Sequence, residues 1–129
     1  DGPEGLEYDI ETFIYKRRKP FDLDKLNEYA EGWPTSIIRA KGIMWVTEHP
    51  DTAYVFEQAG RQMTMDESSM FVAATEEERK QAITEYPEIM EDWDPEVGDR
   101  MNKICFIGRH MDKEALIAGL DSCLVDWHK

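Results

Sequence analysis

The sequence predicts an α+β fold, in which a largely antiparallel, four- to five-stranded sheet carries helices packed on one face. The first sign is residues 36–47, which alternate like a strand and are long and apolar enough for the centre of a sheet. The second is a helical spacing of apolar residues over 23–31 and 116–124. The third is that the other strand-like segments follow one another without strict βα alternation, which favours α+β over a doubly wound fold.

The composition is that of a globular chain with an acidic surface. It has 129 residues, of which 41% are hydrophobic and 33% charged, and this suits one domain with its own core. The formal net charge of −13 repels phosphate backbones, so we expect no nucleic-acid partner. The basic cluster at residues 16–19 is too short to change this and is interpreted as a solvated strand end.

The sequence contains no sign of export or of a membrane partner. No apolar run approaches the roughly 20 residues that cross a bilayer, and the acidic N-terminus is unlike a signal peptide. Cys105 and Cys123 form no CxxC pair. We therefore expect a cytoplasmic, reducing compartment and two buried thiols.

The domain organisation is predicted to be simple. Residues 1–7 carry two glycines and a proline and are predicted to be a linker or tail, which leaves 8–129 as a single domain. The chain begins with Asp1 and not with Met. We expect it to be a fragment of a longer protein or a trimmed form of one.

The first elements are a strand and a helix. Residues 8–15 alternate with a period of two and are rich in β-branched and aromatic residues, which predicts a strand that Pro20 stops. Asp22 is a suitable N-cap for a helix over residues 23–31, and Gly32 ends that helix.

The predicted central strand, residues 36–47, has two unlike faces. One face is apolar throughout and consists of Ile38, Ala40, Met44 and Val46. The other changes from charged to aromatic along its length and consists of Arg39, Lys41, Ile43 and Trp45. The apolar face is expected to lie in the core, and the second face is the candidate surface for a partner.

Further strands are predicted after the central one. Residues 53–59 favour a strand antiparallel to it, 61–65 a third short strand, 66–69 a turn, and 70–72 a continuation of the sheet. Residues 103–109 are largely apolar, which is typical of an interior strand.

Two further helices are predicted, with a polar excursion between them. Thr75 begins a capping box with an acidic first turn, and Pro87 ends this helix. Residues 94–99 are loop-like. Asp112 caps the last helix, whose apolar stripe consists of Leu116, Ile117, Leu120, Cys123 and Leu124.

No motif in the chain supports an enzyme. Phosphate-binding glycine loops, a nucleophile elbow and a zinc-protease helix are all absent from the sequence, so we assign no catalytic and no cofactor-binding residue. The weak metal candidates are His110, Cys105 and Cys123, together with nearby carboxylates. They share no ligand spacing.

The sequence nevertheless resembles a known family. Residues 13–21 (FIYKRRKPF) resemble the opening FVYRxRRPF of the CobW C-terminal domain, and residues 39–45 (RAKGIMW) are similar to its RAKGFFW strand. Further matches follow in the same order at residues 50–51, 58–61 (QAGR), 93, 98–100 (GDR), 106–108, 111–112 and 120–124. Each match is short, but the ordered set covers nearly the whole chain.

The resemblance implies the accessory domain of a GTP-hydrolysing metallochaperone concerned with cobalamin synthesis or zinc homeostasis. In that family, GTP, Mg and a transition metal, zinc or cobalt, belong to an N-terminal GTPase domain with a Walker A loop and a CxCC motif. Neither motif occurs in this chain, so no family metal site or GTPase residue is carried over to it. The implied partners are that GTPase domain and a client metalloprotein.

Three functions remain open on this evidence. The first is a non-catalytic recognition or regulatory domain that uses the Arg39, Lys41, Ile43 and Trp45 face. The second is a metal-binding module that uses His110 with Cys105 or Cys123. The third is a small-molecule sensor of ferredoxin-like shape, which only the coarse topology supports.

Overall fold

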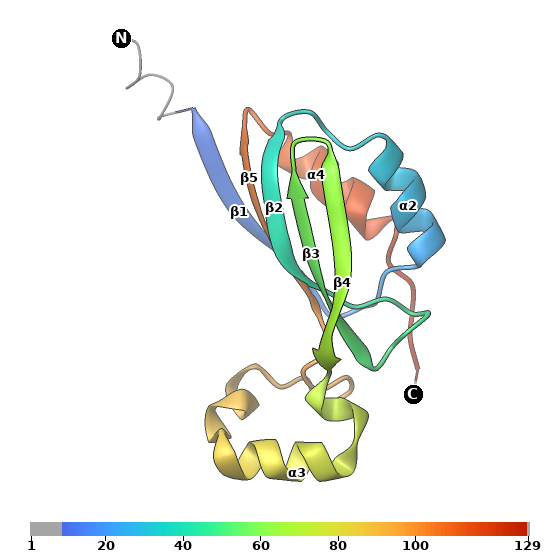
Figure 1. Cartoon of the computed structure of the whole chain (residues 1–129), viewed down its shortest axis with the longest axis vertical. Helices are drawn as coiled ribbons and strands as arrows, with labels where there is room; N and C mark the ends of the chain where they lie inside the picture. Colours follow the sequence, from blue (N-terminus) through green and yellow to red (C-terminus); the bar gives the residue numbers. More distant parts are fainter. Residues whose placement is uncertain (1–8, 129) are drawn as a thin grey trace.

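A computed structural model describes residues 9–128 of the chain and shows one five-stranded sheet (Figure 1). The strands are β1 (Ile10–Arg17), β2 (Ile37–Met44), β3 (Thr52–Ala59), β4 (Gln62–Met70) and β5 (Asn102–Arg109). Their order across the sheet is β1-β5-β2-β3-β4, and every neighbouring pair is antiparallel. This confirms the predicted fold class. The predicted linker or tail, residues 1–7, lies outside the described residues.

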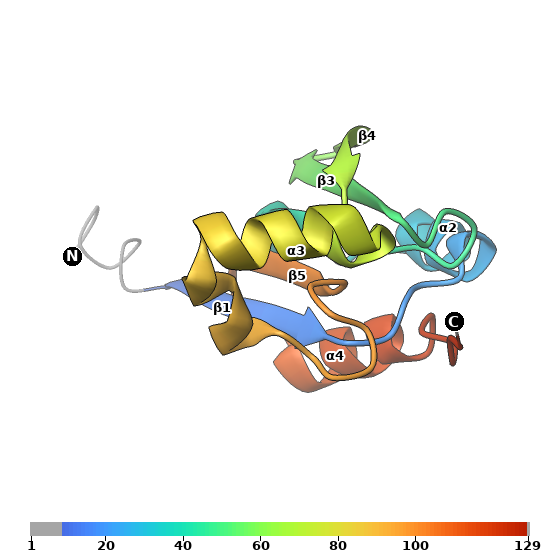
Figure 2. The same cartoon turned by 90° about the horizontal axis from the view of Figure 1, so that it is seen from below.

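Two helices, α2 (Leu23–Glu31) and α4 (Lys113–Asp121), lie on the same face of the sheet (Figures 1 and 2). They bury Leu26, Leu116 and Leu120 against a core that the sheet supplies from all of its inner strands. Each begins at the aspartate that the sequence predicts as its cap, because Asp22 accepts a 3.0 Å hydrogen bond from the amide of Lys25 and Asp112 one from Ala115.

Strand β2 lies at the centre of the sheet, as predicted, but the predicted face of one of its residues is wrong. A bulge between Ile37 and Arg39 inserts an extra residue opposite β5. Ile37 is therefore the residue that faces the core, with 3% of its surface exposed, and Ile38 is 45% exposed. The residues beyond the bulge, Ala40 and Met44, are buried as expected.

Between β4 and β5 the chain leaves the sheet and forms an excursion beyond its end (Figure 1). The excursion contains the short 3-10 helix η1 (Val72–Ala74), the helix α3 (Glu76–Glu85) and a second 3-10 helix η2 (Pro87–Asp92). Thr75 caps α3 as predicted, with its hydroxyl accepting a bond from the amide of Glu78. The predicted turn at residues 66–69 is wrong, since β4 runs through to Met70. No helix in the described part of the chain is long and apolar enough to span a membrane.

Candidate interaction face

The face of the sheet opposite α2 and α4 carries no covering helix among the described residues, and we call it the open face (Figure 1). Cross-strand partners place its side chains in three main rows. The rows are Thr12, Ile107, Arg39, Ala59 and Gln62; then Ile14, Cys105, Lys41, Glu57 and Thr64; then Lys16, Lys103, Ile43, Val55 and Asp66. Ile10 and Arg109 form a further pair at one corner.

The open face combines exposed apolar side chains with basic ones. Ile14 is 61% exposed and Ile43 is 43% exposed, although both are β-branched residues of the kind that usually pack. Five lysines and arginines lie on this face against two acidic side chains, in a chain whose net charge is −13. Lys41 pairs with Glu57 at 3.5 Å, but both side chains are more than half exposed, so the pair holds neither of them strongly. The face therefore has the chemistry to bind an acidic surface with apolar patches.

The predicted partner surface is only partly on this face. Arg39, Lys41 and Ile43 lie on it and are exposed. Trp45 does not, because the chain leaves the strand after Met44 and turns the indole under the base of the excursion. The tryptophan is 0% exposed, so its prediction as a partner contact is wrong.

The surroundings of Trp45 explain its burial. It packs edge-on against Phe71 and Trp127, with ring centroids 6.4 and 5.3 Å away. Its indole Nε1 donates a 3.0 Å hydrogen bond to the carbonyl of Pro50, and its amide donates a 2.7 Å bond to Oδ1 of Asn102. Trp45 is therefore the centre of a second, smaller core at the excursion end of the sheet.

The three predicted metal candidates lie apart from one another. Cys105 is exposed in the middle row of the open face, which contradicts the prediction of a buried thiol. Cys123 is buried as predicted, and its thiol donates to the carbonyl of Lys25 at 3.4 Å; burial raises its pKa. His110 lies in the turn between β5 and α4 with its side chain 80% exposed, and its Nε2 lies 4.0 Å from a carboxylate oxygen of Asp9.

No group of three His, Cys, Asp or Glu side chains that could hold a metal ion occurs within residues 9–128. The geometry therefore gives no support to a metal site built from His110, Cys105 or Cys123.

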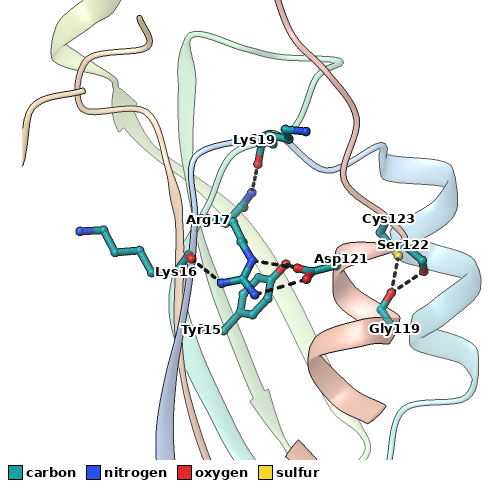
Figure 3. A network of polar contacts seen from close by, with 9 residues as sticks. Tyr15, Lys16, Arg17, Lys19, Gly119, Asp121, Ser122 and Cys123 are labelled. Atoms are coloured by element: carbon teal, nitrogen blue, oxygen red, sulfur yellow. Dashed lines mark hydrogen bonds and ion pairs between the residues drawn. The ribbon is translucent and has the colours of Figure 1, made fainter. Parts of the chain in front are cut away.

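A polar network ties β1 to the end of α4 on the covered face (Figure 3). The hydroxyl of Tyr15 donates a 2.7 Å bond to Asp121, and the guanidinium of Arg17 donates to both oxygens of the same carboxylate, at 2.9 and 3.3 Å. The pKa of Tyr15 is raised mainly by burial and, to a smaller extent, by its hydrogen bond to Asp121. Burial acts to raise the pKa of Asp121, but the hydrogen bonds from Arg17 and Tyr15 outweigh it and lower that pKa.

This network is structural. Its hydroxyl, guanidinium and carboxylate bind one another, so together they join β1 to the end of α4. Arg17 belongs to the basic cluster predicted to be solvated, and its pairing with Asp121 cannot be predicted from local sequence because the two residues are 104 positions apart.

A family model and a curated relative both match nearly the whole chain. The family model described as the cobalamin synthesis protein cobW C-terminal domain matches residues 10–124. The chain is 31% identical over 127 residues to "Zinc-regulated GTPase metalloprotein activator 1" of Dictyostelium discoideum, and this covers 95% of the chain but only 27% of that protein.

Solved structures show the same fold. The chain is similar to the zinc-bound YjiA GTPase of E. coli, with a TM-score of 0.61 and 14% identity over 97% of this chain and 33% of that one. It is similar also to a zinc-bound triple mutant of the YjiA GTPase, with a TM-score of 0.62 and 16% identity over 91% of this chain and 30% of that one. The chain thus spans about a third or less of the length of these relatives.

Proposed function

Because the chain belongs to the CobW C-terminal domain family, we propose that it acts as the non-catalytic recognition domain of a metal-handling GTPase. In this proposal GTP and Mg are bound by a GTPase domain that precedes it, and the handled metal is also held there. The name of the Dictyostelium relative supports zinc over cobalt as that metal. A client metalloprotein would be the final recipient.

The observation that carries the proposal is the open face. An uncovered face of an antiparallel sheet is usually polar where it meets water. Here it exposes Ile10, Ile14 and Ile43 beside five basic side chains, and exposed apolar patches of this kind mark interaction sites. We assign this face to the GTPase domain of the same protein, whose matching surface is expected to carry acidic and apolar side chains.

Reversing the charge of the open face is expected to weaken this contact. The Lys41→Glu, Lys103→Glu double variant replaces two neighbouring lysines on adjacent rows with glutamates, which would repel an acidic partner surface. We expect the affinity for the separately produced GTPase domain, measured by calorimetry, to fall at least about tenfold, since like charges placed across an interface cost several kcal/mol.

The matched control makes the same change on the covered side of the molecule. Lys25 and Lys113 are exposed lysines on α2 and α4. A Lys25→Glu, Lys113→Glu variant is expected to bind the GTPase domain like the unchanged chain. Equal binding by both double variants and the unchanged chain would show that the open face is not the docking surface.

A further inference from the structure

The excursion carries a second surface, whose chemistry is opposite to that of the open face. Helix α3 and η2 enclose a shallow groove of about 530 Å³. Its floor is apolar and includes Val72, Ala82 and Ile89, and its rim carries Glu78, Glu85 and Glu88. Figure 1 shows α3 beyond the lower end of the sheet, below α2 and α4, and Figure 2 shows it lying across that end.

The helix that forms this groove has no core of its own. No residue of α3 is buried, whereas α2 and α4 each bury leucines. Tyr86 and Met90, at the end of α3 and in η2, are 59% and 43% exposed. The exposed apolar surface is therefore that of the groove with Tyr86 and Met90, and it is not an apolar face of α3, which is mostly charged along its length.

The charge around the groove is strongly negative. Residues 76–96 contain nine acidic side chains and two basic ones. Lys80 pairs with Glu76 at 3.7 Å, and Arg79 lies over the ring of Trp93. Among the described residues, neither basic side chain pairs with a rim glutamate; Glu85 accepts only a hydrogen bond from Gln81. The negative field of the rim is therefore available to a cationic ligand.

The base of the excursion is held firmly, so the groove is presented in a fixed place. Arg18 donates to the carbonyls of Gly98 and Arg100 and to the carboxylate of Asp92, the last residue of η2. The Asp99 carboxylate accepts bonds from the amides of Val72 and Ala73 at the start of η1. Both ends of the excursion are thus tied to the end of the sheet.

We propose that this groove binds a basic amphipathic segment of a partner protein. Lysine or arginine stems would lie on Val72, Ala82 and Ile89, and their charged heads would reach the rim glutamates. Phosphate backbones and anionic lipid surfaces are excluded by the same negative charge. The surface is distinct from the open face in position and in sign, so one domain can contact two proteins at once.

The proposal is tested with a fluorescein-labelled synthetic helix that carries leucine on one face and lysine and arginine on the other. Its affinity is measured by fluorescence anisotropy at physiological ionic strength. The groove variant is Glu78→Gln, Glu85→Gln, Glu88→Gln, and the control variant is Glu28→Gln, Glu31→Gln, Glu114→Gln on α2 and α4. The two variants change the net charge equally, and the exposed positions in both leave the fold intact.

We expect the groove variant to lose at least about tenfold in affinity and the control variant to lose far less, because only close charges escape screening by salt. A second probe, with serine in place of leucine, should bind weakly. Equal loss in the two variants, no binding to the unchanged chain, or equal binding of the serine probe would overturn the proposal.

Analytical sedimentation of the chain alone tests whether a second copy of the chain occupies the groove. The open face of a second copy is also basic and apolar, so self-association is conceivable on charge alone. We expect the unchanged chain and the groove variant to sediment alike as single copies. If the unchanged chain formed an oligomer and the groove variant did not, the groove would bind a second copy of the chain. This result would overturn the proposal of a separate partner.

Discussion

The Gly42→Ala variant is expected to be less stable than the unchanged chain by about 3 kcal/mol, because the added methyl group overpacks the centre of the sheet. Gly42 lies in β2, where the backbone of β5 approaches it closely. A Cβ at this position would lie 2.6 Å from the Cα of Ile104 and nearer still to the carbonyl oxygen of Lys103. Backbone atoms cannot move aside as a flexible side chain can, so β2 and β5 would have to separate.

The measurement is urea unfolding followed by tryptophan fluorescence, with Gly32→Ala as control. Gly32 follows α2 at a φ of −105°, and a Cβ there would meet nothing nearer than a carbonyl oxygen at 3.9 Å. The control is expected to change stability by less than about 1 kcal/mol. Equal midpoints for Gly42→Ala and the unchanged chain would contradict the close approach of β2 and β5.

The Arg100→Met variant is expected to lower the free energy of unfolding by about 3 kcal/mol, because the carbonyls that Arg100 binds lose their donor while Asp51 is half exposed to water. Arg100 is 3% exposed and donates to the carboxylate of Asp51 at 2.9 Å and to the carbonyls of Pro50 and Val97. Its guanidinium also lies 4.8 Å from the ring centroid of Trp127. Methionine fills a similar volume but satisfies none of these acceptors.

The effect should be local to the excursion and its base. Hydrogen exchange is expected to speed up over residues 71–99 while the amides of β5 stay protected. The control is Arg61→Met in the exposed β3–β4 turn, for which we expect a change within about 0.5 kcal/mol. Uniform loss of protection across the sheet would show instead that Arg100 supports the whole fold.

Features that depend on neighbouring residues could be predicted from the sequence. The helix caps at Asp22, Thr75 and Asp112 were predicted because a cap and its amide partner lie three residues apart. The central place of β2 was predicted because its length and composition suit a strand with sheet on both sides. The family was predicted because its short motifs occur in order along the chain.

Features that depend on long-range register could not be predicted. Ile38 is exposed because of a bulge opposite β5, a strand far away in the sequence. Trp45 is buried because distant residues at the base of the excursion pack against it. Cys105 is exposed because none of the helices in residues 9–128 covers its face of the sheet, which strand periodicity cannot reveal. Ile14 and Lys103 belong to the open face because β1 pairs with β5, the first strand with the last.

The two proposed surfaces differ in charge as well as in place. The open face is basic in an acidic chain, and the groove on the excursion concentrates the acidic residues. Lys16 on the open face pairs with Asp92, the last residue of η2, at 2.6 Å, so the excursion is tied to the edge of the open face at the end of β1. This arrangement would let one small domain hold a GTPase domain and a second protein side by side.

The alkylation rate of Cys105 tests the central claim most directly, because this thiol lies in the middle row of the open face and Cys123 is buried. Iodoacetamide labelling is followed by peptide mass spectrometry, in this chain alone and in this chain joined to the proposed preceding GTPase domain. We predict fast labelling of Cys105 in the chain alone, strong protection in the joined protein, and slow labelling of Cys123 in both. Equally fast labelling of Cys105 in both would contradict the assignment of the open face to the GTPase domain.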